Sequence, residues 1–330
     1  MKTVGVTVFE GSASRSVRAH IETVVAVCGP GRGGRVRPVA AGLAVGLMVA
    51  ATWGSAAWGS VASASGGKIY WANASADTIG KASLNGTHVD QSFIKGADGP
   101  SDVVVHGGHI YWANATGCTE SGSCPGTIGR ANLNGTHVKE NFIPADTPYG
   151  MAVEGQYIYW SNTGSNTIGR AKLDGSAVNQ QFITGADQPD GVVVNGQHIY
   201  WSNAGSNTIG EASLDGTAVN QSVIAGAMTP EGMAIDSQHI YWVNHYGRSI
   251  GRAHLDGSAA NESFIAGAGN YPTRVAVDGR HVYWTTWTID AVPSAGTIGE
   301  ANLDGSHVNN NLIRSTASPV GVAVSAKQSR

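Results

Sequence analysis

Charged residues are scarce in this sequence, and proline and cysteine are scarcer still. Of the 330 residues, only 13% are charged, 11 are proline and three are cysteine. So few cysteines exclude a disulfide-stapled miniprotein, and 46 glycines with so few prolines exclude collagen. A long apolar pattern with a period of 3.6 residues is also missing, which argues against a coiled coil or a helical array.

The residues that are present can bury a large core. Nine tryptophans and ten tyrosines argue against a disordered chain, and glycines among β-branched residues indicate tight turns between short strands. Residues 1–64 hold six Lys/Arg and two Asp/Glu, which leaves a net charge of −7 on residues 65–330. This acidic part lacks the basic surface of a nucleic-acid-binding protein, so we expect no nucleic-acid partner.

The N-terminal residues 1–64 have the pattern of an export signal. Arginines precede the apolar run Val39–Ala51, and small residues then lead to Ala62-Ser63-Ala64. A basic region, here a long one, followed by an apolar region and an A-x-A site is typical of a secretory signal peptide. The alternative is an uncleaved anchor, which would be the one contact with a membrane. In both cases we expect residues 65–330 to be secreted or to lie on the outer face of the membrane.

Two cysteines fall within residues 65–330, Cys118 and Cys124. An even pair in an exported, loop-like segment favours a local disulfide. The alternative is half of a metal site, which would need nearby His or Cys residues that this loop lacks.

Residues 65–330 form an internal repeat. The pair Tyr-Trp recurs six times, at 70–71, 111–112, 159–160, 200–201, 241–242 and 283–284. Each copy continues with Thr/Ser-Ile-Gly-x-Ala-x-Leu-Asp/Asn-Gly, and later a proline introduces residues such as Gly-Val-Ala-Val. Short β-branched and aromatic runs, separated by Asn-Gly, Asp-Gly and Gly-Gly, predict four short strands per copy. One copy is therefore one blade of a β-propeller.

The copies start and stop out of phase. The repeat opens on the second strand of a unit, Lys68–Trp71, and ends on a lone first strand, Val320–Val324. Six blades are complete only if these two strands pair, which also removes open sheet edges. We predict an all-β fold, a six-bladed β-propeller of four-stranded blades closed by its C-terminal strand, and we expect a monomer. Asn195-Gly196 and Asp215-Gly216 predict hairpin turns with positive φ.

Three motifs carry a family resemblance: Tyr-Trp-x-Asn, Ile-Gly-Arg-Ala-x-Leu-Asp-Gly and Pro-x-Gly-x-Ala-Val. Together they resemble the class B repeat of the low-density-lipoprotein receptor, the YWTD propeller, over about residues 68–324. The resemblance implies a six-bladed propeller that binds proteins or packs against neighbouring modules. Asn replaces the family's Asp in five copies, and Lys81, Glu211 and Glu300 replace the arginine of the third strand. The pattern is also similar to streptogramin B lyase and to gluconolactonase-like propellers of bacteria.

The repeated residues are interpreted as architecture. A Tyr-Trp pair in a strand places its two rings on opposite faces, so we predict that the rings fill the space between neighbouring blades rather than stack on a sugar. The Asn that follows each Trp by two residues is expected to bond the backbone of the following turn.

Residues that differ between copies are the candidates for function. Loops between second and third strands, and loops that join blades, lie on one face of a propeller, which we name the loop face; the tight turns lie on the turn face. Copies three and four have plain Gly, Ser and Asn there, whereas other copies carry rings and a guanidinium, which are common in hot spots. The alternative is drift in loops that tolerate insertion. The candidate binding residues are Tyr149, His245, Tyr246, Arg248, Tyr271, Arg274 and Trp287.

Three acids near the first-strand prolines, Asp102, Asp190 and Glu231, are candidate ligands for Ca²⁺ or Mg²⁺ at the mouth of the channel, with solvated surface acids as the alternative. The sequence has no HExxH, no GxSxG and no phosphate loop, and it names no catalytic residue. The first interpretation is a non-enzymatic binding or scaffold propeller that recognises an extracellular protein or glycan and needs no cofactor. The alternative is an extracellular lyase or lactonase-like hydrolase with a divalent metal at the mouth.

Overall fold

The computed structural model describes residues 66–115, 125–288, 295–315 and 317–325, all within one compact unit, Gly59–Arg330. The predicted signal segment and both cysteines of the predicted disulfide, Cys118 and Cys124, lie outside the described residues. Within those ranges, no helix is long and apolar enough to cross a membrane.

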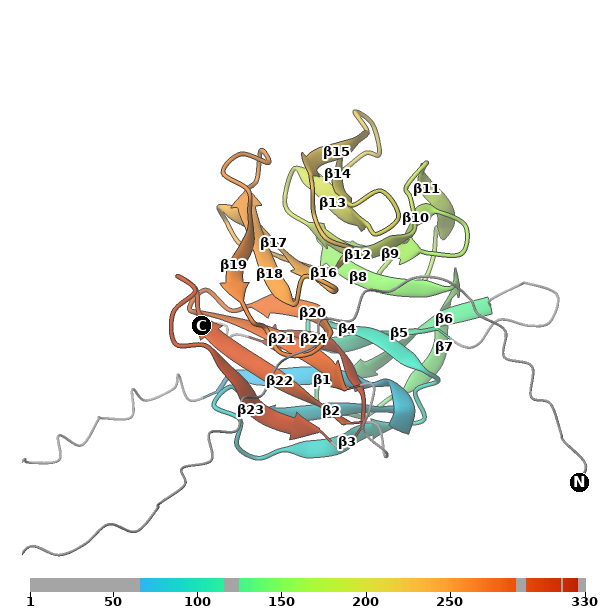
Figure 1. Cartoon of the computed structure of the whole chain (residues 1–330). Helices are drawn as coiled ribbons and strands as arrows, with labels where there is room; N and C mark the ends of the chain where they lie inside the picture. Colours follow the sequence, from blue (N-terminus) through green and yellow to red (C-terminus); the bar gives the residue numbers. More distant parts are fainter. Residues whose placement is uncertain (1–65, 116–124, 289–294, 316, 326–330) are drawn as a thin grey trace, which may run out of the picture. The chain divides into compact units, whose positions relative to one another are not determined.

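The first three blades are antiparallel four-stranded sheets (Figure 1). Blade 1 contains β1 (Lys68–Asn73), β2 (Thr78–Ser83), β3 (Asp90–Lys95) and, from the other end of the chain, β24 (Pro319–Ser325). Blade 2 contains β4 (Pro100–His106), β5 (His109–Asn114), β6 (Pro125–Asn132) and β7 (Lys139–Asp146). Blade 3 contains β8 (Pro148–Glu154), β9 (Tyr157–Asn162), β10 (Thr167–Lys172) and β11 (Asn179–Thr184).

The last three blades repeat this order without interruption. Blade 4 contains β12 (Pro189–Val194), β13 (His198–Asn203), β14 (Thr208–Ser213) and β15 (Asn220–Ala225). Blade 5 contains β16 (Pro230–Ile235), β17 (His239–Asn244), β18 (Ser249–His254) and β19 (Asn261–Ala266). Blade 6 contains β20 (Pro272–Val277), β21 (His281–Thr288), β22 (Ala295–Asn302) and β23 (Asn309–Ser315). The one helical element of the described ranges is a short 3₁₀ turn, η1 (Ala74–Ala76).

The two ends of the repeat close the ring as predicted. Strand β24 pairs antiparallel with β1, in a register that runs from Lys68 opposite Ser325 to Asn73 opposite Pro319. The backbone N–H of Ala74 also donates to the carbonyl oxygen of Ser318 at 3.1 Å. The inner strands β24, β4, β8, β12, β16 and β20 each contact the next one around the centre of the ring. The predicted six-bladed, all-β fold is therefore confirmed.

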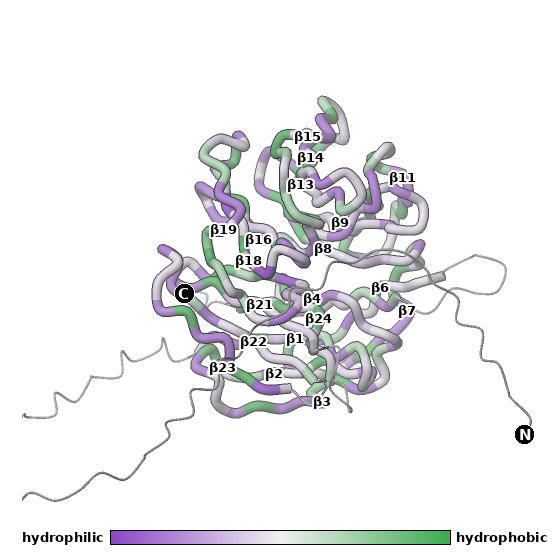
Figure 2. Tube along the Cα trace, viewed as in Figure 1, coloured by the Kyte–Doolittle hydropathy of each residue, from purple (hydrophilic) through white to green (hydrophobic). Residues whose placement is uncertain are grey.

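The core lies between the blades rather than within one sheet. Each of six apolar clusters holds the Tyr of one blade and the Trp of the next: Tyr70 with Trp112, Tyr111 with Trp160, Tyr159 with Trp201, Tyr200 with Trp242, Tyr241 with Trp284 and Tyr283 with Trp71. The last pair joins blade 6 to blade 1, so the predicted packing of the rings between blades is confirmed. Figure 2 shows hydrophobic and hydrophilic residues interspersed along the strands of the ring.

The glycine of the Ile-Gly motif makes room for the tryptophan ring. In blade 4, Gly210 lies opposite Trp201 in the sheet, and a Cβ added to it would meet the indole at 2.3 Å. The same clash, at 2.1 to 2.4 Å, is found in all six copies. A side chain at this position would displace the largest ring of the core, which explains why every copy has glycine.

The asparagine after each Tyr-Trp pair ties loops to the blade. In blade 4, Asn203 Nδ2 donates to the carbonyl oxygen of Gln221 at 3.0 Å, and its Oδ1 accepts from the N–H of Asp187 at 2.9 Å. Asn203 bonds backbone groups, but the predicted partner is wrong: these groups lie in the fourth strand and in the loop that enters the blade, not in the following turn. An ionised Asp could not donate to this carbonyl oxygen, so the bond requires the amide of Asn.

The turn prediction holds at one of its two sites. Gly216 has a φ of +85°, as expected for Asp215-Gly216. Neither Asn195 nor Gly196 has a positive φ, so the prediction for that turn is wrong. The reason is a side chain: Asn195 Oδ1 accepts from the N–H groups of Gln197 and His198, at 2.9 and 2.8 Å, and closes the turn as an Asx turn.

Candidate functional site

The first residues of the inner strands meet at the loop face. Each inner strand begins at a proline, and the residue after it lines a cavity of about 350 Å³ at the end of the channel. We name this cavity the mouth pocket. The six residues that follow the prolines are Ser101, Tyr149, Asp190, Glu231, Thr273 and Val320. Pro100, His245, Arg274 and Trp287 also line the pocket.

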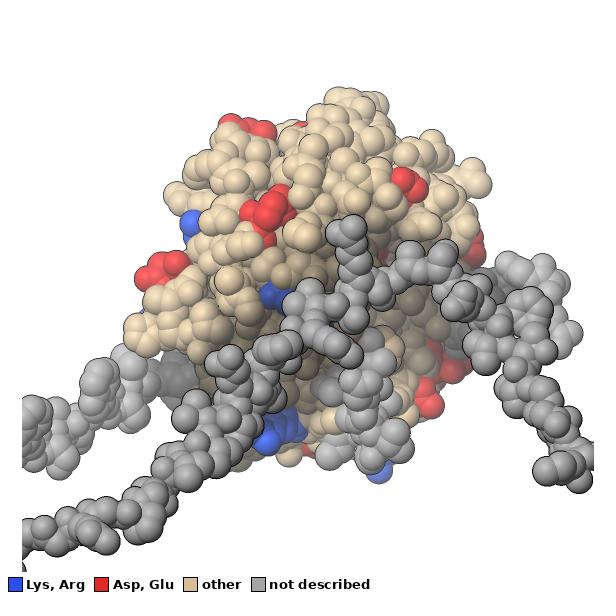
Figure 3. Space-filling view, in the orientation of Figure 1, with Lys and Arg blue, Asp and Glu red and all other residues tan. Residues whose placement is uncertain are grey.

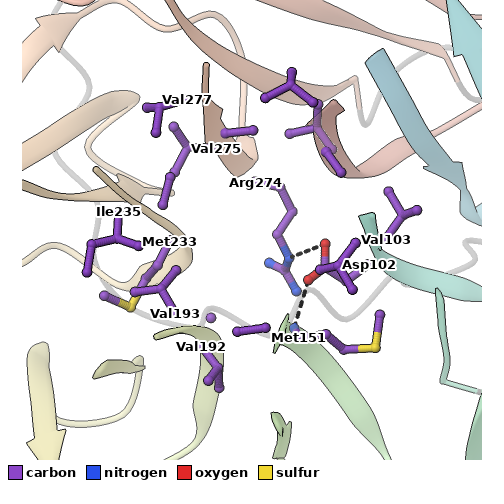
Figure 4. A pocket seen from close by; sticks show the side chains of 18 of the residues that line it. Asp102, Val103, Met151, Val192, Val193, Met233, Ile235, Arg274, Val275 and Val277 are labelled. Atoms are coloured by element: carbon purple, nitrogen blue, oxygen red, sulfur yellow. Dashed lines mark hydrogen bonds and ion pairs between the residues drawn. The ribbon is translucent and has the colours of Figure 1, made fainter. Parts of the chain in front are cut away.

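One residue deeper, charged side chains replace glycine in two of the six copies. Gly150, Gly191, Gly232 and Gly321 allow the inner strands to approach closely; a Cβ on Gly232 would lie 2.4 Å from Arg274 Cδ. The other two blades have Asp102 and Arg274, whose side chains point toward each other across the centre of the ring (Figure 4). Both line a second cavity of about 300 Å³, whose other residues are Val, Ala, Met, Ile and Gly, and Arg274 also lines the mouth pocket. Arg274 therefore forms the floor of the mouth pocket, and the apolar channel lies beneath it.

Arg274 connects three alternate blades. Its Nη1 donates to Asp190 Oδ1 at 2.5 Å, and its Nε lies 3.9 Å from Asp102 Oδ1. Asp102 Oδ2 accepts from the backbone N–H of Met151 at 2.8 Å. Only 6% of the Arg274 side chain is exposed. Because these groups come from blades 2, 4 and 6, the ion pairs also fix the centre of the ring.

Burial shifts the pKa values of the charged groups around this floor. It raises the pKa of Asp102 to about 6, although Arg274 and the N–H of Met151 both lower it. Burial also raises the pKa of Asp190, against the effect of Arg274 and with the help of the negative charge of Glu231. Burial lowers the pKa of Arg274, but the neighbouring carboxylates outweigh it and raise that pKa, so the guanidinium stays charged. Three carboxylates thus surround one permanent cation.

His245 and Glu231 form a pair on the wall of the pocket. His245 Nδ1 lies 3.2 Å from Glu231 Oε1 and 3.1 Å from the carbonyl oxygen of Pro272. Burial lowers the pKa of His245, but the hydrogen bond and charge of Glu231 outweigh this and raise it above its ordinary value. An imidazole held by a carboxylate is the arrangement that orients a general base. The sequence named both residues, but it did not show that they pair.

Four aromatic rings lie in or beside the mouth pocket: Tyr149 and Trp287 line it, and Tyr246 and Tyr271 pack against His245, which also lines it. The side chain of Tyr246 is 70% exposed, and Tyr149 and Trp287 are each 37% exposed. Tyr271 is half-buried, and the guanidinium of Arg248 lies 5.3 Å from the centre of its ring. We name Tyr149, Tyr246, Tyr271 and Trp287 the aromatic rim. All four lie on the loop face, as the sequence predicts.

Two candidate residues differ from the expected placement. Arg274 was expected among exposed recognition residues, but it lies in β20, is 5% exposed and is held in ion pairs. The reason is its place in the strand, since the second residue after the proline faces the centre of the ring. Trp287 was expected in a loop, but β21 continues to Thr288 and pairs Trp287 with Gly296.

Met228 belongs to this surface and was missed by the sequence analysis. It is 52% exposed, and its sulfur would lie 3.4 Å from a Cβ added to Gly247, between Tyr246 and Arg248. The corresponding loops of blades 2, 3 and 4 have Asp98, Asp146 and Asp187 instead. The replacement of this Asp by Met in blade 5 was the sequence difference that could have identified Met228.

The donor set does not fit a divalent metal. Asp102 and Asp190 both face Arg274, and Glu231 bonds His245. Across the described ranges, no three His, Cys, Asp or Glu side chains converge as a ligand group. A guanidinium already occupies the place between the two aspartates that a cation would need.

No protein-family model matches this chain, and no curated protein matches it. Solved structures do. A chain of the nidogen/laminin complex is 20% identical over 80% of this chain and 100% of its own, with a TM-score of 0.62. Virginiamycin B lyase from Staphylococcus aureus is 18% identical over 77% of this chain and 84% of its own, with a TM-score of 0.53. A putative 6-phosphogluconolactonase from Bacteroides fragilis is 13% identical over 75% and 81%, with a TM-score of 0.50.

This chain is a six-bladed β-propeller. The resemblance to YWTD and bacterial lyase propellers that the motifs indicated is thereby confirmed as a likeness of fold. At these identities the likeness shows the fold alone, and function has to be argued from the site.

Proposed function

We propose that this chain is a secreted or surface-exposed binding module that recognises a partner protein through its loop face. The observation that carries the proposal is the division of that face. Tyr149 and Trp287 line a concave pocket, and Tyr246, Tyr271 and Met228 lie on the same face beside it, whereas the matching loop of blade 4 holds Ala204, Gly205, Ser206 and Asn207. Large, rigid rings beside a pocket are the residues that dominate binding energy in protein interfaces.

The relatives of this fold support either a binding or a catalytic interpretation. One comes from a complex of two proteins, nidogen and laminin, and another is a lyase. The surface of this chain favours a protein partner, because exposed Tyr, Trp and Met side chains suit recognition.

The test is a selection of displayed peptides on the immobilised full-length chain, with a glycan array probed in parallel. We expect peptides to be enriched. Their affinity should fall by about 2 kcal/mol for Trp287→Ala or Tyr246→Ala, and by almost nothing for Ser165→Ala or Ser206→Ala. All four residues lie outside the Tyr–Trp clusters, so the melting temperature should hardly change.

If the substitutions at Ser165 and Ser206 weaken binding as much as those at Trp287 and Tyr246, the aromatic rim is the product of sequence drift and not a binding surface. Binding to glycans with no enriched peptide would replace the protein partner by a sugar. Failure of both arms would contradict the proposed function.

A second candidate function rests on the His245–Glu231 pair, which could serve a lyase or a hydrolase of lactones as a general base. Its test is turnover of cyclic depsipeptide lactones and simple lactones by the full chain. Turnover that is abolished by His245→Ala would support the enzyme. A rate no higher than the uncatalysed rate would reject the enzyme and leave the binding module as the proposed function.

A further inference from the structure

We propose that Arg248 binds a carboxylate of the partner protein, an Asp or Glu side chain, and that Tyr246 and Met228 take an apolar residue next to that acid. This inference rests on the proposed function, because it assumes a protein partner. It adds the chemistry of the partner segment, which is an acidic residue beside an apolar one.

Arg248 stands at a position where other copies of the repeat have Asn or Asp. Its φ is +51°, and the corresponding residues of blades 1, 3 and 4 have φ between +52° and +58°: Asp77, Asn166 and Asn207. Asn and Asp are favoured in this left-handed region. In those blades the side-chain oxygen also accepts from a backbone N–H of the loop that enters the next blade, at 2.8 to 3.0 Å.

The arginine gives up both of these advantages. Its side chain has no acceptor atom, so Arg248 cannot make the bond to the next loop, and it holds a backbone conformation that suits Asn better. A residue that costs stability at an exposed site is a candidate for function. Arg248 is therefore the residue of blade 5 that folding explains least.

The guanidinium of Arg248 contacts a ring and, in the part of the chain that the structure describes, no carboxylate. It lies over Tyr271, 5.3 Å from the centre of the ring. None of the ion pairs within the described ranges includes Arg248. A guanidinium held beside a ring keeps N–H groups in its own plane, where one carboxylate can accept two of them.

The acid that could neutralise this arginine is replaced in blade 5. The loops that enter blades 2, 3 and 4 have an Asp two residues before the proline, whereas the loop that enters blade 5 has Met228. Blade 4 has Asp187 and Asn207 where blade 5 has Met228 and Arg248, so these two positions are more positive by two charges in blade 5. The Met228 sulfur would lie 3.4 Å from a Cβ on Gly247, so the exchanged residue lies against the loop that carries Arg248.

Apolar surface lies beside this charge. Tyr246 is 70% exposed and Met228 is 52% exposed. The ring of His245 contacts those of Tyr246 and Tyr271, with centres 4.9 and 5.4 Å apart, so the rings and the guanidinium form one continuous surface. Tyr, Met and Arg are the residue types enriched in protein interfaces. A partner with an acid alone would leave this apolar surface in water, which is why the segment needs an apolar residue beside its acid.

The other charges of the loop face are divided in the same way. Lys95 and Arg314, at the loop-face ends of fourth strands in blades 1 and 6, add positive charge on the side of Arg248. The acids lie in the loops that enter blades 2, 3 and 4: Asp98, Asp146 and Asp187. An acidic segment would therefore be drawn toward blades 5, 6 and 1. Most of the surface in Figure 3 carries neither charge, which makes these few groups count for more.

The test selects peptides from a displayed random library on the full-length chain and, in parallel, on Arg248→Asn. We expect the parent to enrich peptides with Asp or Glu next to an apolar residue, relative to the unselected library and to the variant. A synthetic peptide chosen by the parent should lose about tenfold in affinity when its acid is replaced by the amide, or when the protein carries Arg248→Asn. The two changes together should lose little more than either alone, because they remove the same contact.

The variants are chosen so that folding does not decide the result. Arg248→Asn restores the residue of blades 3 and 4, so its melting temperature should equal or exceed that of the parent. Arg248→Glu should reverse the preference, from acidic to basic peptides. The matched control is Arg280→Gln, an exposed arginine in a tight turn of the turn face, which should change neither the selection nor the affinity.

Selected peptides without an excess of acids, or acidic peptides whose affinity Arg248→Asn leaves unchanged, would overturn the inference. The proposed function would still stand in that case if the peptides lose affinity with Trp287→Ala and Tyr246→Ala. Failure to enrich any peptide on the parent would overturn both the inference and the protein partner. The two failures are therefore distinguishable.

Discussion

At the scale of single residues, the centre of the ring is set by two departures from glycine. Four copies keep glycine two residues after the proline, and the other two have Asp102 and Arg274. Because the six positions converge, one acid and one base placed there meet although 172 residues separate them. Asp190, from the neighbouring position of a third blade, completes the group.

The raised pKa of Asp102 predicts how stability depends on pH. The folded pKa of about 6 lies above the ordinary value of 3.8, so the folded state binds the proton more tightly than the unfolded state does. The contribution to stability is complete below about pH 4 and is lost as pH rises through about 6, by an amount on the order of 2–3 kcal/mol. Asp190 and His245, whose pKa values are also raised, act in the same direction.

Asp102→Asn should therefore flatten the fall in unfolding free energy between pH 4 and pH 7, as measured by denaturant unfolding at each pH. Asp174→Asn, in an exposed turn on the opposite face, serves as the control. An unchanged pH profile in Asp102→Asn would contradict the burial of this carboxyl group.

The sequence predicted part of this site. Comparison of the copies identified Tyr246, Trp287 and Tyr149, because a ring among Gly, Ser and Asn is visible without a structure. It did not predict the Arg274–Asp190 pair, because spacing along the chain gives no distance across a ring. Nor did it find Met228, which takes the place of an Asp rather than of a small residue.

At the scale of the element, the Ile-Gly motif of the repeat is explained by one packing contact. The Ile-Gly glycine lies under the tryptophan of the neighbouring strand, and a Cβ on Gly210 would lie 2.3 Å from Trp201. Gly196, in a turn of the same blade, has no neighbour within 4 Å and no positive φ.

Gly210→Ala should lower the free energy of unfolding by about 1–3 kcal/mol, because the indole has to move in a packed core. Gly196→Ala should stay within about 0.5 kcal/mol of the parent. Denaturant unfolding followed by tryptophan fluorescence measures both. Equal effects of the two substitutions would show that the indole ring of Trp201 does not pack against Gly210.

One residue of the third strand and one of the fourth strand vary together between the copies of the repeat. Lys81, Arg130, Arg170 and Arg252 each lie over a phenylalanine of the fourth strand, at 3.4 to 4.1 Å. The copies that carry Glu211 and Glu300 have Val223 and Leu312 at that position, and their glutamates lie near His198 and His281. Where Glu replaces the cationic residue of the third strand, the phenylalanine that a cation would contact in the fourth strand is therefore replaced as well.

A double-mutant cycle tests this coupling. Glu211→Arg and Val223→Phe should each destabilise blade 4 alone, and together they should recover about 0.5–1 kcal/mol through a cation–π contact. The quantity measured is the unfolding free energy of the parent, the two single variants and the double variant. Strict additivity would mean that the two positions do not interact.

At the scale of the whole molecule, the fold follows from the phase of the repeat. Six Tyr-Trp copies and a lone final strand leave one blade incomplete unless β24 pairs with β1, and this pairing is what the structure has. The closing cluster of Trp71 and Tyr283 adds apolar packing to the same seam.

Deletion of residues 319–330 should therefore cause aggregation or loss of the cooperative melt, because it exposes the edge of β1 and opens the ring. Deletion of residues 326–330 alone, which leaves β24 complete, should melt like the parent in calorimetry. A cooperative, unshifted melt after the longer deletion would place the seam elsewhere.

The most direct measurement of the central claim is hydroxyl-radical footprinting of the full-length chain with and without a selected peptide, read by mass spectrometry. Binding through the loop face predicts protection of Met228, Tyr246 and Trp287, which are 52%, 70% and 37% exposed in the free protein. His137 and His307, exposed on the turn face, should be oxidised equally in both samples. Protection of the turn-face histidines, with Met228, Tyr246 and Trp287 unchanged, would contradict the account.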